Sequence, residues 1–228
     1  DRDETKLKIV SGNEIQTLYH ENFYHCPNGA RIGTLWNSCM RYAKKNHFMS
    51  IYALNPDKIK MLVKFDEVGR VKTRALLWEE TNDLTGKTWK VMDRIYSVFE
   101  HDVVLFKNWA HKNGYVHRWE QSARNETLFT NFDGQPIRLD LTVKLNNHLC
   151  DSYPYIDTFF GVSFKKKQLF HDPNGRKKIR YELRTTTGQI YERFNNNVLP
   201  ATEVYDIDDQ LVTFTGPLCE PAATLSNT

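Results

Sequence analysis

The stretch that decides the fold is residues 87–121, which read KTWKVMDRIYSVFEHDVVLFKNWAHKNGYVHRWEQ. Residues 87–97 alternate between polar and apolar side chains, as a half-buried strand does. Val103, Phe106 and Ala110 then recur at helical spacing, and Gly114 is a residue that commonly ends a helix. Residues 115–121 return to a strand pattern. A strand, a helix and a strand in so short a stretch predict a crossover unit with parallel strand pairing.

The start of this helix carries a local signal. Ser97 and Glu100 have the spacing of a capping box, in which the two side chains satisfy each other's backbone amides. We therefore expect the helix to begin directly after Ser97.

Before this unit, the sequence predicts helices at 12–25 and 31–45 and a short segment at 48–54. Strands follow at 60–66, 70–80 and 87–97, joined by a turn at 67–69 and a polar loop at 81–86. Short connections of this kind indicate an antiparallel meander.

The second half is rich in strand patterns, at 126–132, 136–145, 158–170, 176–186 and 189–194, with turns at 131–134 and 171–175. The sequence thus predicts an α+β protein with a mixed, mostly antiparallel sheet. We expect residues 1–125 to form an α/β core. Residues 126–228 would form a β-rich extension that ends in an acidic tail.

Composition excludes several classes of protein. No apolar run is long enough to span a membrane, and no apolar segment of a signal peptide follows the charged first residues. The four cysteines lie far apart without a C-x-x-C motif, so we expect reduced thiols and no zinc ribbon. The sequence has no P-loop, G-x-S-x-G or H-E-x-x-H motif, and we expect no metal and no cofactor.

The order of helix, helix, three antiparallel strands, helix and strand over residues 12–122 resembles the GNAT acyltransferase fold. In that family, the loop matching residues 98–102 is glycine-rich, and its amides hold the pyrophosphate of acetyl-CoA. Here the loop has no glycine, and Glu100 and Asp102 add negative charge. The resemblance therefore implies the fold without the cofactor.

Five segments also resemble uncharacterised proteins of tailed bacteriophages: Asn37–Arg41, Ile51–Pro56, Arg74–Trp78, Asp93–Tyr96 and Tyr153–Thr158. The resemblance implies a phage origin, with the protein in the cytoplasm of an infected cell or on the virion. It implies no activity.

Charged residues within the meander form the first candidate site. If the loop at 81–86 closes symmetrically, Trp78 faces Trp89 and Arg74 faces Asp93. Opposed charges across a strand pair are usually structural. The functional interpretation is a polar site on the sheet, in which Arg74 or Arg94 binds an anionic ligand.

The second candidate is a basic hairpin at 163–184, closed by the turn at 171–175. It holds eight basic residues against two acidic ones, although the whole chain carries a net charge of only +3. Its candidate binding residues are Lys165, Lys166, Lys167, Arg176, Lys177, Lys178 and Arg180. Aromatic residues interleave with them, as expected for contact with a nucleic-acid backbone and its bases. An acidic protein, a second copy of this chain or a solvated edge strand are the alternatives.

These observations favour a phage-encoded accessory protein that acts by binding. Two other functions stay open: an active GNAT-type acyltransferase with an atypical cofactor loop, and a structural component of the virion.

Overall fold

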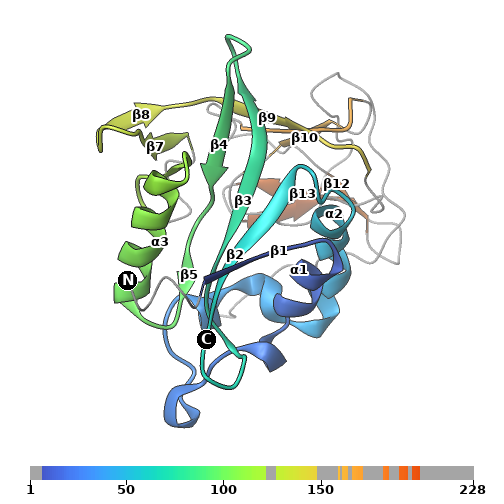
Figure 1. Ribbon diagram of the computed structural model, residues 1–228. Helices are drawn as coiled ribbons and strands as arrows, with labels where there is room; N and C mark the ends of the chain where they lie inside the picture. Colours follow the sequence, from blue (N-terminus) through green and yellow to red (C-terminus); the bar gives the residue numbers. More distant parts are fainter. Residues whose placement is uncertain are drawn as a thin grey trace.

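The computed structural model describes residues 7–121, 127–147, 159, 161–163, 166–171, 182–184, 190–194 and 197–200. They form a mixed sheet of 11 strands with helices, and a second sheet of three strands (Figure 1). The predicted α+β class with a mostly antiparallel sheet is confirmed. Among the described residues, no helix is both long and apolar enough to cross a membrane.

The predicted meander is confirmed. Strands β1 (Leu7–Ser11), β2 (Ile59–Phe65), β3 (Val71–Asp83) and β4 (Thr88–Met92) pair in this order, each antiparallel to the next. The sequence analysis missed β1. It also ended the second strand at residue 80, whereas β3 continues to Asp83 before the chain turns.

The crossover unit is also confirmed. Helix α3 (Glu100–Lys112) joins β4 to β6 (Val116–Arg118), and of the strand pairs in the described residues only β4 and β6 run parallel. The strand predicted at 87–97 is interrupted, because the chain leaves the sheet after Met92 and returns as β5 (Tyr96–Ser97) beside β3.

The predicted capping box is wrong. Helix α3 begins at Glu100, and its cap is Phe99, which makes no side-chain hydrogen bond to the helix. The Ser97 hydroxyl is buried and contacts Thr73 instead (2.7 Å), and it accepts the Phe99 N–H (3.1 Å). Ser97, which the local pattern predicted as the helix cap, thus uses its side chain for contacts at β5 instead.

The two long helices predicted near the N-terminus are wrong as well. Within residues 7–58, only α1 (Asn13–Leu18) and α2 (Ser50–Ala53) are α-helical. Between them lie the 3-10 turns η2 (Glu21–Phe23), η3 (Pro27–Gly29), η4 (Leu35–Asn37), η5 (Cys39–Arg41) and η6 (Ala43–Met49). Gly33, with φ of +79°, and the extended Ser38 break any continuous helix, while Leu35, Trp36 and Met40 still reach the core.

The described strands between residues 127 and 171 extend the same sheet. On one side β7 (Leu128–Thr130) and β8 (Pro136–Arg138) follow β6, and on the other β9 (Leu141–Lys144) pairs with the far end of β3. Strand β11 (Gln168–Phe170) joins β9 to β10 (Gly161–Ser163). The predicted boundary at residue 125 therefore falls within one continuous sheet. The second sheet consists of β12 (Glu182–Arg184), β13 (Ile190–Phe194) and β14 (Asn197–Pro200), all antiparallel.

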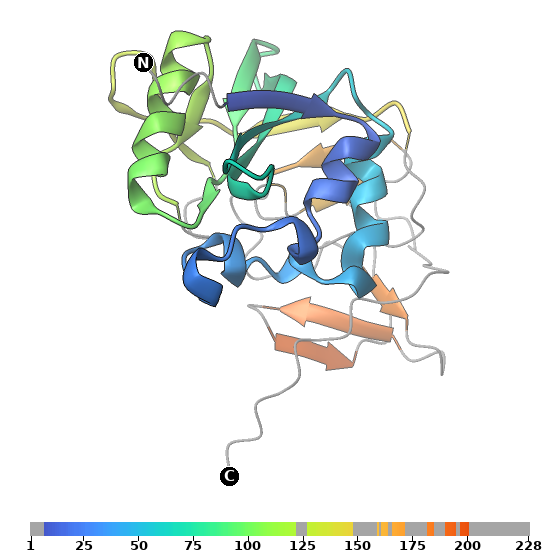
Figure 2. The same cartoon turned by 60° about the horizontal axis from the view of Figure 1, so that its bottom comes forward.

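Apolar residues pack on both faces of the large sheet. Alternation along β3 sends Ala75 and Leu77 toward α3, and Leu76 and Trp78 toward the opposite face. Helices α1 and α2, the 3-10 turns and residues from β7, β9 and β11 cover that second face. Figure 2 shows α3 well separated from α1 and α2. Arg74 therefore lies within a sheet that is buried on both faces, whereas Asp93 and Arg94 follow β4 where the chain leaves the sheet.

Candidate functional site

Arg74, the first candidate residue, is a core residue. It is 1% exposed, and its guanidinium lies 3.7 Å from the ring centre of Tyr19 and 4.7 Å from that of Tyr96. It donates hydrogen bonds to the hydroxyls of Tyr24 (3.1 Å) and Ser38 (2.9 Å). Stacking on aromatic faces suits a guanidinium that leaves water. Arg74 therefore joins the N-terminal turns to β3.

The predicted pairing of Arg74 with Asp93 is wrong. Strand β3 has an irregularity between Trp78 and Thr81, and its register places Arg74 opposite Tyr96. Trp78 pairs with Val91 and not with Trp89. The symmetrical loop assumed from the sequence does not exist, because β3 runs on to Asp83.

Asp93 belongs to a different buried group. Its carboxylate accepts hydrogen bonds from Trp78 Nε1 (3.0 Å) and from the Arg94 backbone N–H (2.6 Å), and it lies 4.0 Å from the Arg118 guanidinium. Burial raises the pKa of Asp93, and it outweighs the opposing effects of Arg118 and the two hydrogen bonds. Asp93 directly follows β4 and Arg118 is the last residue of β6, so both lie at the carboxyl ends of the two parallel strands, where α/β sheets often bind ligands.

Arg94 and Gln121 join the two parallel strands where they diverge. Arg94 Nε donates to the Gln121 carbonyl oxygen (2.8 Å), and the Ile95 N–H donates to Gln121 Oε1 (2.7 Å). The guanidinium of Arg94 also lies over the ring of Tyr96 (4.9 Å). A ligand that binds after Met92 would need the backbone groups at this strand edge. Gln121 already occupies the Ile95 N–H there.

The loop before α3, where the resemblance puts a pyrophosphate, is covered by residues 33 and 34. The Thr34 hydroxyl accepts the Ser97 N–H (2.9 Å) and donates to the Ser97 carbonyl (3.3 Å). Gly33 packs so closely that a Cβ there would lie 2.3 Å from the Ser97 carbonyl oxygen. The Val98 N–H bonds to the Lys72 carbonyl (2.9 Å). The amides of residues 97, 98 and 99 are therefore all used within the protein.

Asp102 does not point toward the position of a phosphate, contrary to the expectation. It is fully buried and accepts hydrogen bonds from Lys64 Nζ (2.7 Å) and from the Thr73 hydroxyl (2.9 Å). Its charge is neutralised beneath the first turn of α3. This pair anchors the helix to β2 and β3.

The basic hairpin takes a different form from the one predicted. Strands β10 and β11 form a tight hairpin, and the exposed Lys166 and Lys167 lie in its turn. The expected turn began at His171, yet His171 is only 3% exposed. Lys165, Arg176, Lys177, Lys178 and Arg180 lie outside the described residues.

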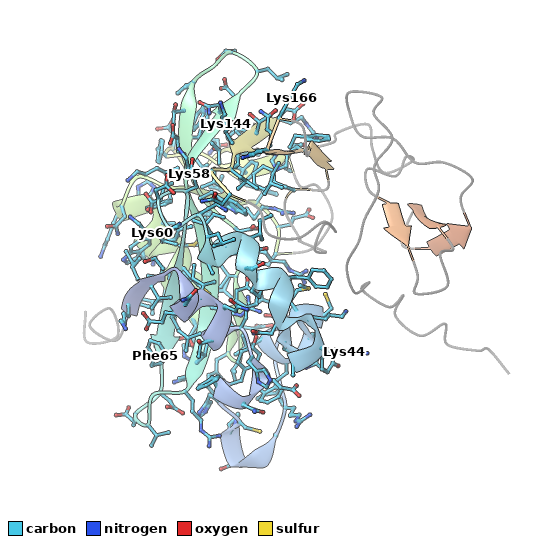
Figure 3. The ribbon with its side chains drawn as sticks, turned by 90° about the vertical axis from the view of Figure 1, so that its right-hand side faces the viewer. Lys44, Lys58, Lys60, Phe65, Lys144 and Lys166 are labelled. Carbon is cyan, nitrogen blue, oxygen red and sulfur yellow. The ribbon has the colours of Figure 1, made fainter. Side chains whose placement is uncertain are left out.

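A lysine surface nevertheless forms at this end of the sheet. Lys144 on β9 is exposed and stands opposite Gln168 in the register, and the Leu145 N–H bonds to the Lys167 carbonyl (2.7 Å). Figure 3 shows Lys166, Lys144 and Lys58 following one another along this side. Lys58 is ion-paired with Glu80. We call Lys144, Lys166 and Lys167 the lysine surface.

The sequence analysis missed Arg118 and His171, which are both buried. Parallel pairing of β4 with β6 places Asp93 beside Arg118. The predicted crossover unit could therefore have indicated that these two residues are neighbours. No local pattern marks His171, which depends on contacts with β7 and β9.

Metal and thiol chemistry find no support in the part of the chain that the structure describes. No three His, Cys, Asp or Glu side chains there come close enough to hold a metal ion. Cys26 and Cys39 form no disulfide within the described residues, and their partly buried thiols pack against the core. In the comparisons with known proteins, no family model matches the chain, and neither a curated protein nor a solved structure matches it.

Proposed function

We propose that this chain is an accessory binding protein of a tailed bacteriophage. Its scaffold would be GNAT-like but closed to acyl-CoA, and its lysine surface would bind a nucleic-acid backbone.

The arrangement of elements supports the scaffold. An antiparallel run of β1 to β4, with α1 and α2 after β1, continues through α3 into a parallel strand. Apart from β1, which the sequence analysis missed, and with two short helices in place of the long ones, this is the order of elements that the sequence resemblance implies. The phage origin is supported only by the five similar segments, and the function is argued from the residues.

The observation that carries the proposal is the closed loop before α3. A backbone phosphate site needs free amides and a close approach of the ligand. The Thr34 hydroxyl uses the amide of Ser97, and Gly33 lies so close to the loop that no Cβ would fit between them. Gln121 uses the amide of Ile95 in the same way. Acyl-CoA would have to displace both contacts.

The lysine surface supports the choice of partner. Lys144 lies on β9, and Lys166 and Lys167 lie in the turn before the neighbouring strand β11, so the three lysines can contact successive phosphates. Such contacts release counterions and make affinity depend steeply on salt. They carry no base information, so binding would not depend on sequence.

Titration calorimetry with acetyl-CoA tests the closed loop. We expect no heat above that of dilution. A dissociation constant in the micromolar range would overturn the proposal in favour of the acyltransferase.

A gel shift with single-stranded DNA tests the partner. On single-stranded DNA, three phosphate contacts predict a slope of log affinity against log salt of about −2, and Lys144→Glu with Lys166→Glu should remove about two of these contacts. The matched control is Lys107→Glu with Lys112→Glu on α3, which changes the net charge equally. Equal losses in both variants would show that only total charge matters. Absence of a shift at about 50 mM salt would overturn the nucleic-acid proposal and leave the acidic protein as partner.

A further inference from the structure

His171 is a buried histidine that fastens β11 to the rest of the sheet. Its ring lies between the rings of Phe159 (4.8 Å between centres) and Phe129 (5.9 Å), and both stack on it. Nδ1 accepts the Leu141 N–H (3.1 Å), while the His171 N–H donates to the Leu141 carbonyl (3.0 Å). The residue thus connects the end of β11 to the start of β9, with aromatic rings on both sides.

The surroundings of His171 disfavour a charged ring. Burial and the nearby positive charge of Arg118 lower its pKa from 6.5 to about 3. Arg118 comes from β6 and has Asp93 4.0 Å away. Asp140 lies between Leu139 and Leu141, the two residues whose backbones meet Nδ1. A proton on His171 would place a second cation beside Arg118 in the protein interior.

The lysine surface depends on the same strands. Lys144 belongs to β9, and Lys166 and Lys167 form the turn that leads into β11. If β11 separates from β9, Lys144 no longer lies beside the other two lysines. The histidine that joins β9 to β11 therefore controls whether the three charges form one surface.

We propose that His171 is a pH-sensitive clasp that releases β11 from β9 on acidification and so dismantles the lysine surface. This inference rests on the proposed function, and it adds a mode of regulation. It also predicts an unusual direction for the pH dependence of polyanion binding. Acid ordinarily strengthens the binding of a polyanion, because lysines keep their charge while carboxylates lose theirs. Here binding weakens as the pH falls.

The direction in which pH changes the release of β11 follows from proton linkage. Released His171 titrates near 6.5 and clasped His171 near 3, so the released state binds more protons between these values. The equilibrium constant for release then rises about tenfold between pH 7.5 and 5.5, and about 30-fold by pH 5. The raised pKa of Asp93 acts in the opposite direction, since acid favours its buried, protonated form. A variant at residue 171 separates the two groups.

The test combines amide hydrogen exchange with DNA binding at about pH 7.5 and about pH 5.5. After correction for intrinsic exchange rates, we expect the opening constant at Leu141 and His171 to rise about tenfold in the wild type. In His171→Gln, which offers an acceptor to the Leu141 N–H but does not titrate, the rise should vanish. His171→Phe, which fills the aromatic stack, is the second non-titrating variant. His111→Gln, at an exposed histidine on α3, is the matched control and should behave as wild type.

The binding measurement uses the same single-stranded DNA. Weaker binding at low pH in the wild type, and no weakening in His171→Gln, supports the clasp. An opening constant that does not change with pH overturns it, and so does a change that persists in both variants at residue 171. If DNA binds at neither pH, the proposed function fails, and hydrogen exchange still decides whether the clasp exists.

Discussion

The buried ion pair of Lys64 and Asp102 offers the sharpest test of how α3 is held. The two side chains are 2% and 0% exposed, and they lie 2.7 Å apart. Lys64 stands opposite Thr73 in the register of β2 and β3, and Thr73 also bonds Asp102. Lys64→Met leaves the carboxylate buried without its ammonium partner. Asp102→Asn removes the charge but keeps an oxygen for the Thr73 hydroxyl.

The expected magnitudes follow from burial. Removing one member of a fully buried pair destabilises a protein by about 3–5 kcal/mol, because the remaining charge stays desolvated. Replacing both members by neutral side chains of similar volume is often close to neutral. Each single variant should therefore lose about 3–5 kcal/mol of unfolding free energy, and the double variant should lose less than either.

Urea unfolding of the four proteins measures this cycle, with the m-value checked for two-state behaviour. The exposed pair Lys8 and Glu14 is the control, since its atoms lie at the same 2.7 Å with side chains 58% and 45% exposed. Lys8→Met should cost no more than about 1 kcal/mol. Additive losses in the double variant, or single losses as small as that of Lys8→Met, would refute the assignment of a buried, coupled pair.

Three further predictions concern the fold. Gly33→Ala should lower the unfolding free energy measured in urea by about 2–4 kcal/mol, because a positive φ is unfavourable for alanine and its Cβ would clash with the Ser97 carbonyl. An unchanged unfolding free energy would show that residues 30–34 are not held against Ser97. Arg74→Lys keeps the charge but loses the stacked plane, and should lower unfolding free energy by about 1–2 kcal/mol. A fragment ending at residue 125 should lack a cooperative thermal transition in near-ultraviolet circular dichroism, because it loses Phe129 and other core residues. A sharp transition in that fragment would support the predicted domain boundary at residue 125.

The parts of the fold that follow from local periodicity were predictable. The meander, the helix of the crossover unit and the parallel return strand all have clear patterns, since each segment has one buried and one exposed face or stripe. The short 3-10 turns between Glu21 and Met49 were not. Their apolar residues have roughly helical spacing, and only tertiary contacts decide that the segment bends along the sheet.

The candidate site was less predictable, because it depends on register. A shift of a few residues in the β3 hairpin changes the partner of Arg74 from Asp93 to Tyr96. His171 was assigned to an exposed turn because Asp172, Pro173, Asn174 and Gly175 follow it, and turn residues mark where a strand ends but not what its last side chain contacts. Long-range contacts of this kind leave no local signal.

The glycine-free loop before α3 has a physical explanation under the proposed relationship. A loop that holds a phosphate needs glycine so that the ligand can approach the backbone. In this protein the close approach to the same backbone is made by Gly33, in a conformation that only glycine adopts easily. The small residue therefore lies on the covering segment and not on the loop that is covered. With the Thr34 hydroxyl bonding both the N–H and the carbonyl of Ser97, the protein supplies from its own chain the contacts that a ligand would otherwise make. Glu100 can then occupy the first turn of α3, where a negative side chain stabilises the helix and would repel a phosphate.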